Sequence, residues 1–198
     1  MAIIVDKVQK RKDIALACKE MFFQNGINDL TIAQIAKKAG VGKGTIYEYF
    51  KNKEDVVFEI VNILIQERNI VVEKELAKVT TTKEKIKLFS QFFYSPEDAE
   101  IRQLYKEAIS IILANPNSEM IAFQSDCVSG YFQWFELLIE EGIQKGELRE
   151  DAKEFSRGLF ALSEGIFIKS QVTHIYDDVE LEIHRFLDAL FNLLEVKK

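Results

Sequence analysis

The sequence has few of the residues that cross-link small folds or interrupt their helices and strands. Only two cysteines, two prolines and two histidines occur among its 198 residues. Cys18 and Cys127 lie on separate predicted helices, so neither a disulfide framework nor a metal site is indicated. His174 and His184 lie ten residues apart with no nucleophile constellation around them, and we interpret both as surface or satisfied histidines. We therefore expect no metal, no cofactor and no enzymatic activity, with a helical enzyme as a remote alternative.

Long apolar runs are missing as well. No stretch approaches the roughly 18 uncharged apolar residues that a membrane-spanning helix requires. In residues 1–13 a short apolar run precedes the charges, which is the reverse of a signal peptide. We therefore expect a cytoplasmic protein with no membrane partner. Its 47% hydrophobic content is enough to bury a substantial core.

The periodicity of the apolar residues is helical throughout. No strand-like alternation of useful length competes with it, and Pro96 and Pro116 fall at natural helix breaks. The sequence therefore predicts an all-α fold, with an amphipathic helix over 7–24 and further helices near 53–77, 82–94, 97–114, 117–145, 152–173 and 179–196.

The segment from Thr31 to Lys53 carries the most specific local pattern. Thr31 followed by Gln34 is a capping box, so a helix should begin at residue 32. Gly40 can adopt the left-handed conformation that ends this helix. A second helix over 42–50 would direct Ile46 and Phe50 inward. Two short helices around a glycine turn are typical of a helix-turn-helix, which binds DNA.

The charges are distributed unevenly along the chain, and this distribution also favours DNA binding by the N-terminal segment. Residues 1–53 hold ten Lys and Arg against five Asp and Glu, whereas the other residues hold 16 against 27. The basic excess thus coincides with the helix-turn-helix, although the whole chain carries a net charge of −6. A basic run is often only a solvated helix face, but its coincidence with a cap, a turn and outward tyrosines favours nucleic-acid binding.

The motif T-I-x-x-I-A-x-x-A-G-V-x-K-G-T-x-Y-x-Y-F-x-x-K-E, complete from Thr31 to Glu54, resembles the DNA-binding domain of the TetR family of bacterial transcription regulators. This resemblance implies two domains. We expect an N-terminal three-helix domain at 1–53 that binds DNA, and a larger helical effector-binding and dimerisation domain at 54–198. The helix that starts at 53 would link them.

The resemblance also implies roles for single residues. Lys43 is the principal candidate for base edges in the major groove, and Gly44 would let the backbone approach DNA closely. The other expected contacts go to bases or to phosphates, which set sequence choice and position respectively. The predicted DNA-binding residues are Thr31, Lys43, Gly44, Thr45, Tyr47, Tyr49 and Lys53.

Aromatic residues are concentrated between 89 and 135. Plain core packing accounts for any single aromatic, but the resemblance implies an effector cavity between these helices, lined by apolar groups with a few polar ones. Gln124, Glu107 and Ser129 are polar candidates chosen for their apolar neighbours. The predicted pocket comprises Phe89, Phe92, Phe93, Tyr105, Glu107, Phe123, Gln124, Tyr131, Trp134 and Phe135.

The last two predicted helices carry more apolar surface than one-sided packing needs. Small residues recur at i, i+3 and i+7 on the first, and the second has a broad apolar arc. Pairing with their copies would give a four-helix bundle, the interface that the resemblance implies, although a monomeric bundle could use the same residues. The predicted interface residues are Gly158, Ala161, Gly165, Phe186, Leu187, Leu190 and Phe191.

Together these features lead to one functional expectation. The protein should be a homodimeric repressor that binds a double-stranded DNA operator by twofold symmetry. An unidentified small apolar or aromatic effector should release it. In the alternative hypothesis the C-terminal domain responds to a protein partner instead of a small molecule.

Overall fold

The computed structural model describes residues 6–197. The first five residues of the predicted DNA-binding domain, and Lys198 at the other end, lie outside this range. The described chain is helical, with a single isolated bridge between Leu148 and Glu195 as its β-type pairing. The described residues form two compact units, one that runs as far as residue 68 and includes 100–123, and one of residues 69–99 with those from 124 onward. The functional division expected at residue 53 stays a prediction.

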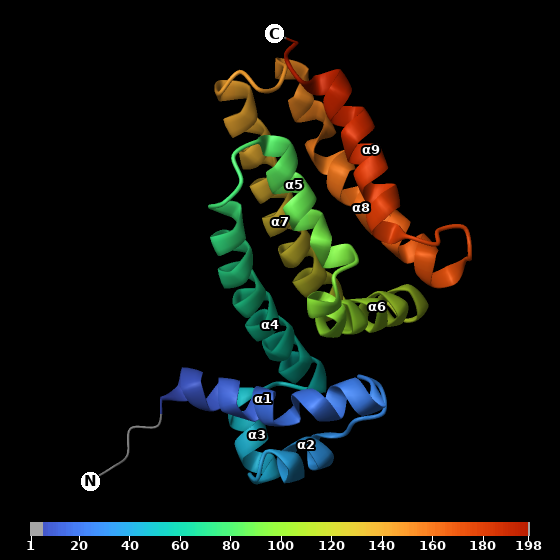
Figure 1. The fold of residues 1–198 in the computed structure, drawn as a ribbon. Coiled ribbons are helices and arrows are strands. Elements are labelled where there is room, and N and C mark those ends of the chain that lie inside the picture. Colours follow the sequence, from blue (N-terminus) through green and yellow to red (C-terminus); the bar gives the residue numbers. More distant parts are fainter. Residues whose placement is uncertain (1–5, 198) are drawn as a thin grey trace. The chain divides into compact units, whose positions relative to one another are not determined.

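The first unit begins with three helices, α1 (Lys7–Asn25), α2 (Ile32–Lys38) and α3 (Lys43–Tyr49), which Figure 1 labels at the start of the chain. The capping box expected at Thr31 and Gln34 is present. Gly40 has a φ of 68° and donates to Lys37, while the amide of Val41 donates to Ala36. These two bonds form a Schellman motif, which closes α2 as the sequence predicted.

The core of these three helices is made of closely packed apolar side chains. Cys18 and Phe22 of α1, Ile35 of α2 and Ile46 of α3 are almost completely buried, as is Phe50 directly after α3. The Cys18 thiol donates to the Ile35 carbonyl at 3.6 Å, and burial raises its pKa to about 11. Cys18 is therefore a protonated core residue near neutral pH, without the thiolate that redox chemistry needs.

Three further helices complete this unit and continue the chain. They are α4 (Lys53–Leu76), α6 (Ala99–Ala114) and α7 (Ser118–Gln144). The first part of α4, all but the first residue of α6 and the start of α7 belong to the first unit. Among residues 6–197, no helix combines the length and hydropathy needed to cross a bilayer.

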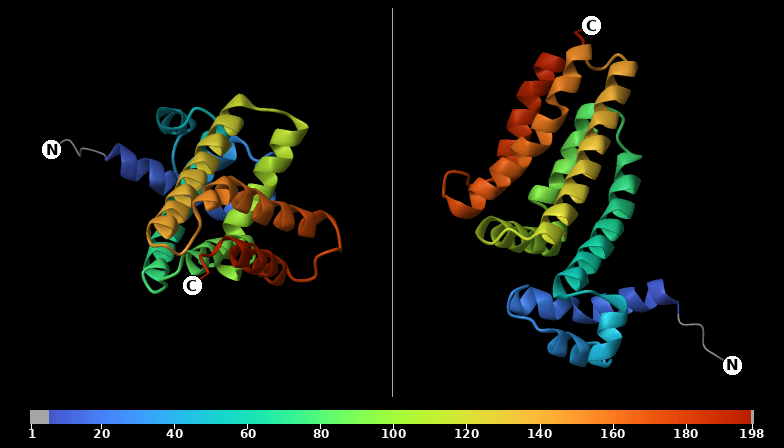
Figure 2. Two further views of the ribbon diagram at one scale, coloured as in Figure 1. Left: turned by 90° about the horizontal axis from the view of Figure 1, so that it is seen from above. Right: turned by 180° about the vertical axis from the view of Figure 1, so that it is seen from behind.

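The second unit is a helical bundle. It contains α5 (Thr82–Ser90), the later part of α7, α8 (Ser156–Val172) and α9 (Val179–Leu194). Helices α8 and α9 lie side by side in Figures 1 and 2. Short 3-10 turns at Gln91–Phe93, Pro96–Asp98 and Glu150–Phe155 join these elements.

The helix expected over 82–94 ends earlier in the structure. The α-helical part stops at Ser90 and continues as a 3-10 turn to Phe93. The Ser90 hydroxyl donates to the Lys87 carbonyl at 2.7 Å and so competes with the regular helix pattern. Pro96 also disfavours helical geometry at the residue before it.

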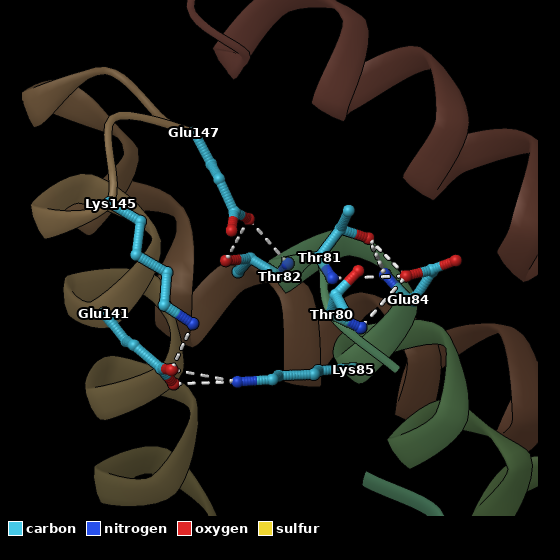
Figure 3. A network of polar contacts seen from close by, with 8 residues as sticks. All are labelled: Thr80, Thr81, Thr82, Glu84, Lys85, Glu141, Lys145 and Glu147. Carbon is cyan, nitrogen blue, oxygen red and sulfur yellow. Dashed lines mark hydrogen bonds and ion pairs between the residues drawn. The ribbon is translucent and has the colours of Figure 1, made fainter. Parts of the chain in front are cut away.

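A polar network fastens the start of α5 to the end of α7, as Figure 3 shows. The Glu147 carboxylate accepts from the amide of Thr82 at 2.8 Å and from its hydroxyl at 2.9 Å. Lys145 and Lys85 both donate to Glu141, and these bonds lower the pKa of that carboxyl to about 2. The network thus satisfies an otherwise unpaired donor at the N-terminus of α5.

The close approach of α5 and α7 requires a glycine at residue 142. A Cβ atom there would lie 2.3 Å from the Thr82 hydroxyl oxygen and 3.0 Å from Leu148 Cδ1. Gly142→Ala should therefore lower the free energy of unfolding by about 1–3 kcal/mol, measured by chemical denaturation. Gly130→Ala is the matched control on the same helix, because a Cβ there meets nothing within 4 Å. It should leave stability unchanged or raise it by up to about 1 kcal/mol. Equal stability of the two variants would contradict the packing argument.

Candidate functional site

Helix α3 presents two different faces. Ile46 on α3 and Phe50 just after it point into the core and are 0% and 2% exposed. Lys43, Gly44 and Tyr47 lie on the outer surface, with Tyr47 61% exposed. Thr45 and Tyr49, the other candidates on α3, are half-buried. The helix therefore brings together Lys43, Gly44 and Tyr47 as one outward group beside its N-terminal end.

Gly44 has no structural reason to be a glycine within the chain. A Cβ added there would meet nothing within 4 Å, and its φ is not positive. Glycine weakens a helix by roughly 0.5–1 kcal/mol relative to alanine. The missing side chain thus leaves the outer surface of α3 open to another molecule.

Two of the predicted DNA-binding residues, Thr31 and Lys53, make hydrogen bonds within the protein. The Thr31 hydroxyl donates to Gln34 Oε1 at 2.7 Å and accepts from the Gln34 amide as part of the capping box. Lys53 Nζ donates to the Asn28 carbonyl at 2.6 Å. In this geometry both side chains support the connection between α1 and α2, and their roles toward DNA stay predictions.

Arg11 on α1 is a functional candidate that the sequence reasoning missed. Its guanidinium donates to the Tyr49 carbonyl at the end of α3. It also bonds to Asp55 and to Glu59 on α4, each at 2.7 Å. A single arginine in an amphipathic helix gives no sequence signal for such contacts, because its partners lie 38 to 48 residues away.

The same unit holds contacts between the helix-turn-helix region and helices α6 and α7. Lys19 on α1 pairs with Glu100 at 2.6 Å, and the Asn52 amide donates to Glu119 at 2.8 Å. The Phe123 ring stacks on Phe58 with centroids 4.4 Å apart. Phe123 therefore contacts α4 within the first unit, outside the aromatic cluster described below.

Glu107 also has a different position from the one expected of a pocket residue. Its carboxylate accepts from the Ile27 amide at 3.0 Å, directly after Gly26 ends α1 with a φ of 77°. The amide after a helix end has no partner within the helix, and Glu107 supplies one. Tyr105, another pocket candidate on α6, is half-buried in the same unit.

The other aromatic candidates gather in the second unit. Phe89, Phe93 and Phe135 are buried, with the centroids of Phe89 and Phe135 4.7 Å apart. Phe160 of α8, which the sequence reasoning did not select, contacts Phe93 and Tyr131 at 5.9 Å and 5.8 Å and lies at the centre of this cluster. The half-buried members of the cluster are Phe92, Tyr131, Phe132 and Trp134. Gln124 on α7, a polar pocket candidate, is also half-buried.

Helices α8 and α9 each have exposed residues among the predicted interface positions. Gly158, Ala161 and Gly165 are all exposed, as the predicted small-residue stripe requires. On α9, by contrast, three of the four predicted interface residues belong to the core of the protomer: Leu187, Leu190 and Phe191 are 1%, 9% and 1% exposed.

The helical period of α9 explains this correction. Leu187, Leu190 and Phe191 continue the inward stripe of the helix, whereas Phe186 points outward and is 37% exposed. Ala189 and Leu193 follow Phe186 at i+3 and i+7 and are also exposed. The outward surface of α9 is therefore the stripe of Phe186, Ala189 and Leu193.

The helix-turn-helix geometry agrees with a comparison against known families. The model of the bacterial regulatory proteins of the tetR family matches residues 14–60, which extend from α1 into α4. The chain belongs to the TetR family.

Known TetR-family proteins are similar over nearly the whole chain. The fatty acid metabolism regulator protein of Bacillus subtilis is 28% identical over 195 residues, covering 95% of each chain. A TetR-family regulator from Cytophaga hutchinsonii has the same fold, with a TM-score of 0.78, 18% identity and coverage of 98% and 99%. A regulator from Saccharomonospora viridis, solved in complex with choline, has a TM-score of 0.74 at 18% identity and covers 96% of this chain and 100% of its own.

Membership of the TetR family confirms the central predictions. The protein is a DNA-binding transcriptional regulator with an all-α fold and an N-terminal helix-turn-helix. Its relatives are transcription regulators and not enzymes, so the alternative of a helical enzyme is set aside.

The open surface at Gly44 gives a prediction in which stability and DNA binding change in opposite directions. Gly44→Ala should raise the free energy of unfolding by about 0.5–1 kcal/mol, because alanine favours the helix. It should also lower duplex affinity about tenfold, the effect of one lost contact, measured by fluorescence anisotropy.

Two variants serve as controls for this prediction. Gly130→Ala should stabilise α7 without changing DNA affinity, whereas Lys43→Ala should lower affinity without a gain in stability. Undiminished DNA affinity in Gly44→Ala would show that α3 does not approach DNA through this surface.

Proposed function

We propose that this TetR-family protein is a homodimeric repressor that a small apolar or aromatic molecule releases from its operator. The observation that carries the proposal is the combination, within one compact unit, of the exposed α3 surface and the contacts of α6 and α7 with the helix-turn-helix. The protein thus has a surface suited to DNA and, in the same unit, helices that can change its position.

Recognition of DNA would depend on α3. Lys43 near its N-terminal end is placed to reach base edges in a major groove, and Tyr47 to donate its hydroxyl to a phosphate. A helix-turn-helix dimer reads two half-sites roughly 34–36 Å apart, so the separation of the two α3 helices decides the affinity. A dimer that occupies its operator in this way would repress by excluding other proteins from the same DNA.

Dimerisation is supported by the outward surface of α8 and α9. Gly158, Ala161 and Gly165 on α8 would let a second helix approach closely, and Phe186 and Leu193 on α9 supply exposed apolar area. A Cβ at Gly158 or Gly165 meets nothing within 4 Å in the protomer. The protomer itself therefore makes no use of these glycines, in contrast to Gly142.

The effector part of the proposal rests on the half-buried aromatic side chains of the second unit. Tyr131, Phe132 and Trp134 on α7 border the packed cluster around Phe160, so their rings combine apolar area with access to solvent. Apolar and aromatic surfaces of this kind bind small organic molecules. The choline complex of one structural relative and the fatty acid regulator among the curated relatives support a small organic effector.

Release would require that the effector bind one conformation better than another. Three polar contacts connect α6 and α7 to the helix-turn-helix region. They join Glu107 to Ile27, Glu100 to Lys19 and Glu119 to Asn52. Movement of α6 or α7 would therefore change the position of α1 and of the segment before α4. Effector binding would in this way change the affinity of the protein for its operator.

The dimer proposal predicts a variant that separates assembly from folding. Gly165→Leu should fold normally, because the protomer has space for a Cβ at this site, yet it should shift the protein to a monomer in light scattering. Operator affinity should then fall, since only a dimer binds two half-sites at once. Gly130→Leu, at another exposed glycine with open space, should stay dimeric. A dimeric Gly165→Leu protein would show that α8 does not form the interface.

The effector proposal can be tested with the single tryptophan of the chain, Trp134. Titration with choline or with a fatty acid should change its emission if the molecule binds at the aromatic cluster. The same ligand should lower operator affinity by about 5- to 150-fold, the usual range of allosteric coupling.

Native mass spectrometry of the purified protein distinguishes the alternative. A copurifying small mass supports the effector, whereas a stoichiometric protein mass supports a protein partner. If a ligand changed Trp134 emission and left operator affinity unaltered, the release mechanism would be refuted.

A further inference from the structure

We propose that Arg11 is a positioning residue for DNA recognition, whose guanidinium fixes the C-terminal end of α3 against α1 and α4. The inference rests on the proposed reading of DNA by α3. Arg11 lies three residues before the part of the chain that the family model matches, so that match assigns it no role.

The geometry places one side chain at the meeting point of three helices. The Nη1 group donates to the Tyr49 carbonyl, Nη2 to Asp55 and Nε to Glu59. The guanidinium carbon also lies 4.2 Å from the centre of the Phe50 ring. Each nitrogen of the guanidinium is thus committed to a partner inside the protein.

The charges around Arg11 keep these bonds formed. Burial alone lowers the pKa of Arg11, but its bonds with Asp55 and Glu59 raise that pKa above its ordinary value. Burial likewise raises the pKa of Asp55, and the bonds from Arg11 and the Lys51 amide hold it below its ordinary range. The Arg11 guanidinium, which lies between two carboxylates, therefore stays charged near neutral pH. Its planar group of N–H donors reaches the two carboxylates and the Tyr49 carbonyl at the same time.

The position of α3 depends on this clamp because α3 offers few other anchors. It has seven residues, and Ile46 is its one fully buried side chain. The Tyr49 carbonyl belongs to the last turn of the helix, where carbonyls have no intrahelical partner. Arg11 supplies that partner and ties it to Asp55 and Glu59, so the end of α3 cannot rotate without breaking bonds to α4. Base readout requires such a fixed direction, because each side chain must meet its base edge in one geometry.

The test compares Arg11→Gln with Lys7→Gln, an exposed position on the same helix that removes the same charge. Affinity is measured by anisotropy for two duplexes, the one that the wild-type protein selects from a random pool and a random-sequence duplex. Arg11→Gln should lower affinity for the selected duplex about tenfold and for the random duplex less than about twofold, with an unchanged salt slope. Lys7→Gln should change the affinities for both duplexes by the same factor.

A second measurement reports on α3 without DNA. In Arg11→Gln the Phe50 amide, which donates to the Ile46 carbonyl at 2.9 Å, should exchange with deuterium faster than in the wild type. Arg11→Lys, which keeps the charge and lacks the planar group of N–H donors, should recover only part of the operator affinity. If Arg11→Gln fails to fold by circular dichroism, Glu59→Gln, which removes one of the two carboxylate charges, should give a smaller loss in the same direction.

Three results would overturn the proposal. Equal losses on both duplexes, with a salt slope reduced by about one, would make Arg11 a phosphate contact. Wild-type affinities and exchange in Arg11→Gln would exclude any role in positioning α3, and full recovery in Arg11→Lys would reduce that role to charge alone. A wild-type protein that binds both duplexes equally would refute DNA reading by α3, and the exchange of the Phe50 amide would still decide whether Arg11 holds that helix.

Discussion

The insertion of Ile46 and Phe50 into the core of the first three helices is the interaction on which the proposed DNA recognition depends. A seven-residue helix is too short to be stable in water by itself, so α3 exists because this packing holds it. Once the inward pair is fixed, the helical period directs Lys43, Gly44 and Tyr47 outward. At the same end of the helix, the bonds of Arg11 to Tyr49, Asp55 and Glu59 add polar restraints to this apolar packing.

Directional polar contacts connect the helix-turn-helix region to α6 and α7. Glu107 accepts from the amide of Ile27 just after α1, and Lys19 and Asn52 each bond to one carboxylate. Hydrogen bonds of this kind weaken steeply with misalignment, unlike an apolar interface that tolerates sliding. In the proposed mechanism a small displacement of α6 or α7 would therefore be transmitted to α1 and not absorbed.

The sequence predicted the helices closely, and its errors have a common origin. Caps, glycines and prolines act within a few residues, so the limits of α1, α4 and α9 agreed with expectation to within about two residues. Leu187, Leu190 and Phe191 were assigned to a partner, although they pack inside the protomer. An apolar arc shows that a face is buried, but it does not show what covers it. For the same reason Glu107 and Phe123 were expected beside the aromatic cluster, since proximity in sequence concealed that their partners are Ile27 and Phe58.

By itself the sequence determined the all-α fold, the helix-turn-helix and the family, because each depends on local residue patterns or on a motif of consecutive positions. The tertiary structure alone decided which aromatic rings surround Phe160, which stripe of α9 faces outward, and that Arg11 joins three helices. These features depend on partners tens of residues apart, and one arginine or phenylalanine in a helical pattern looks like any other until the chain has folded.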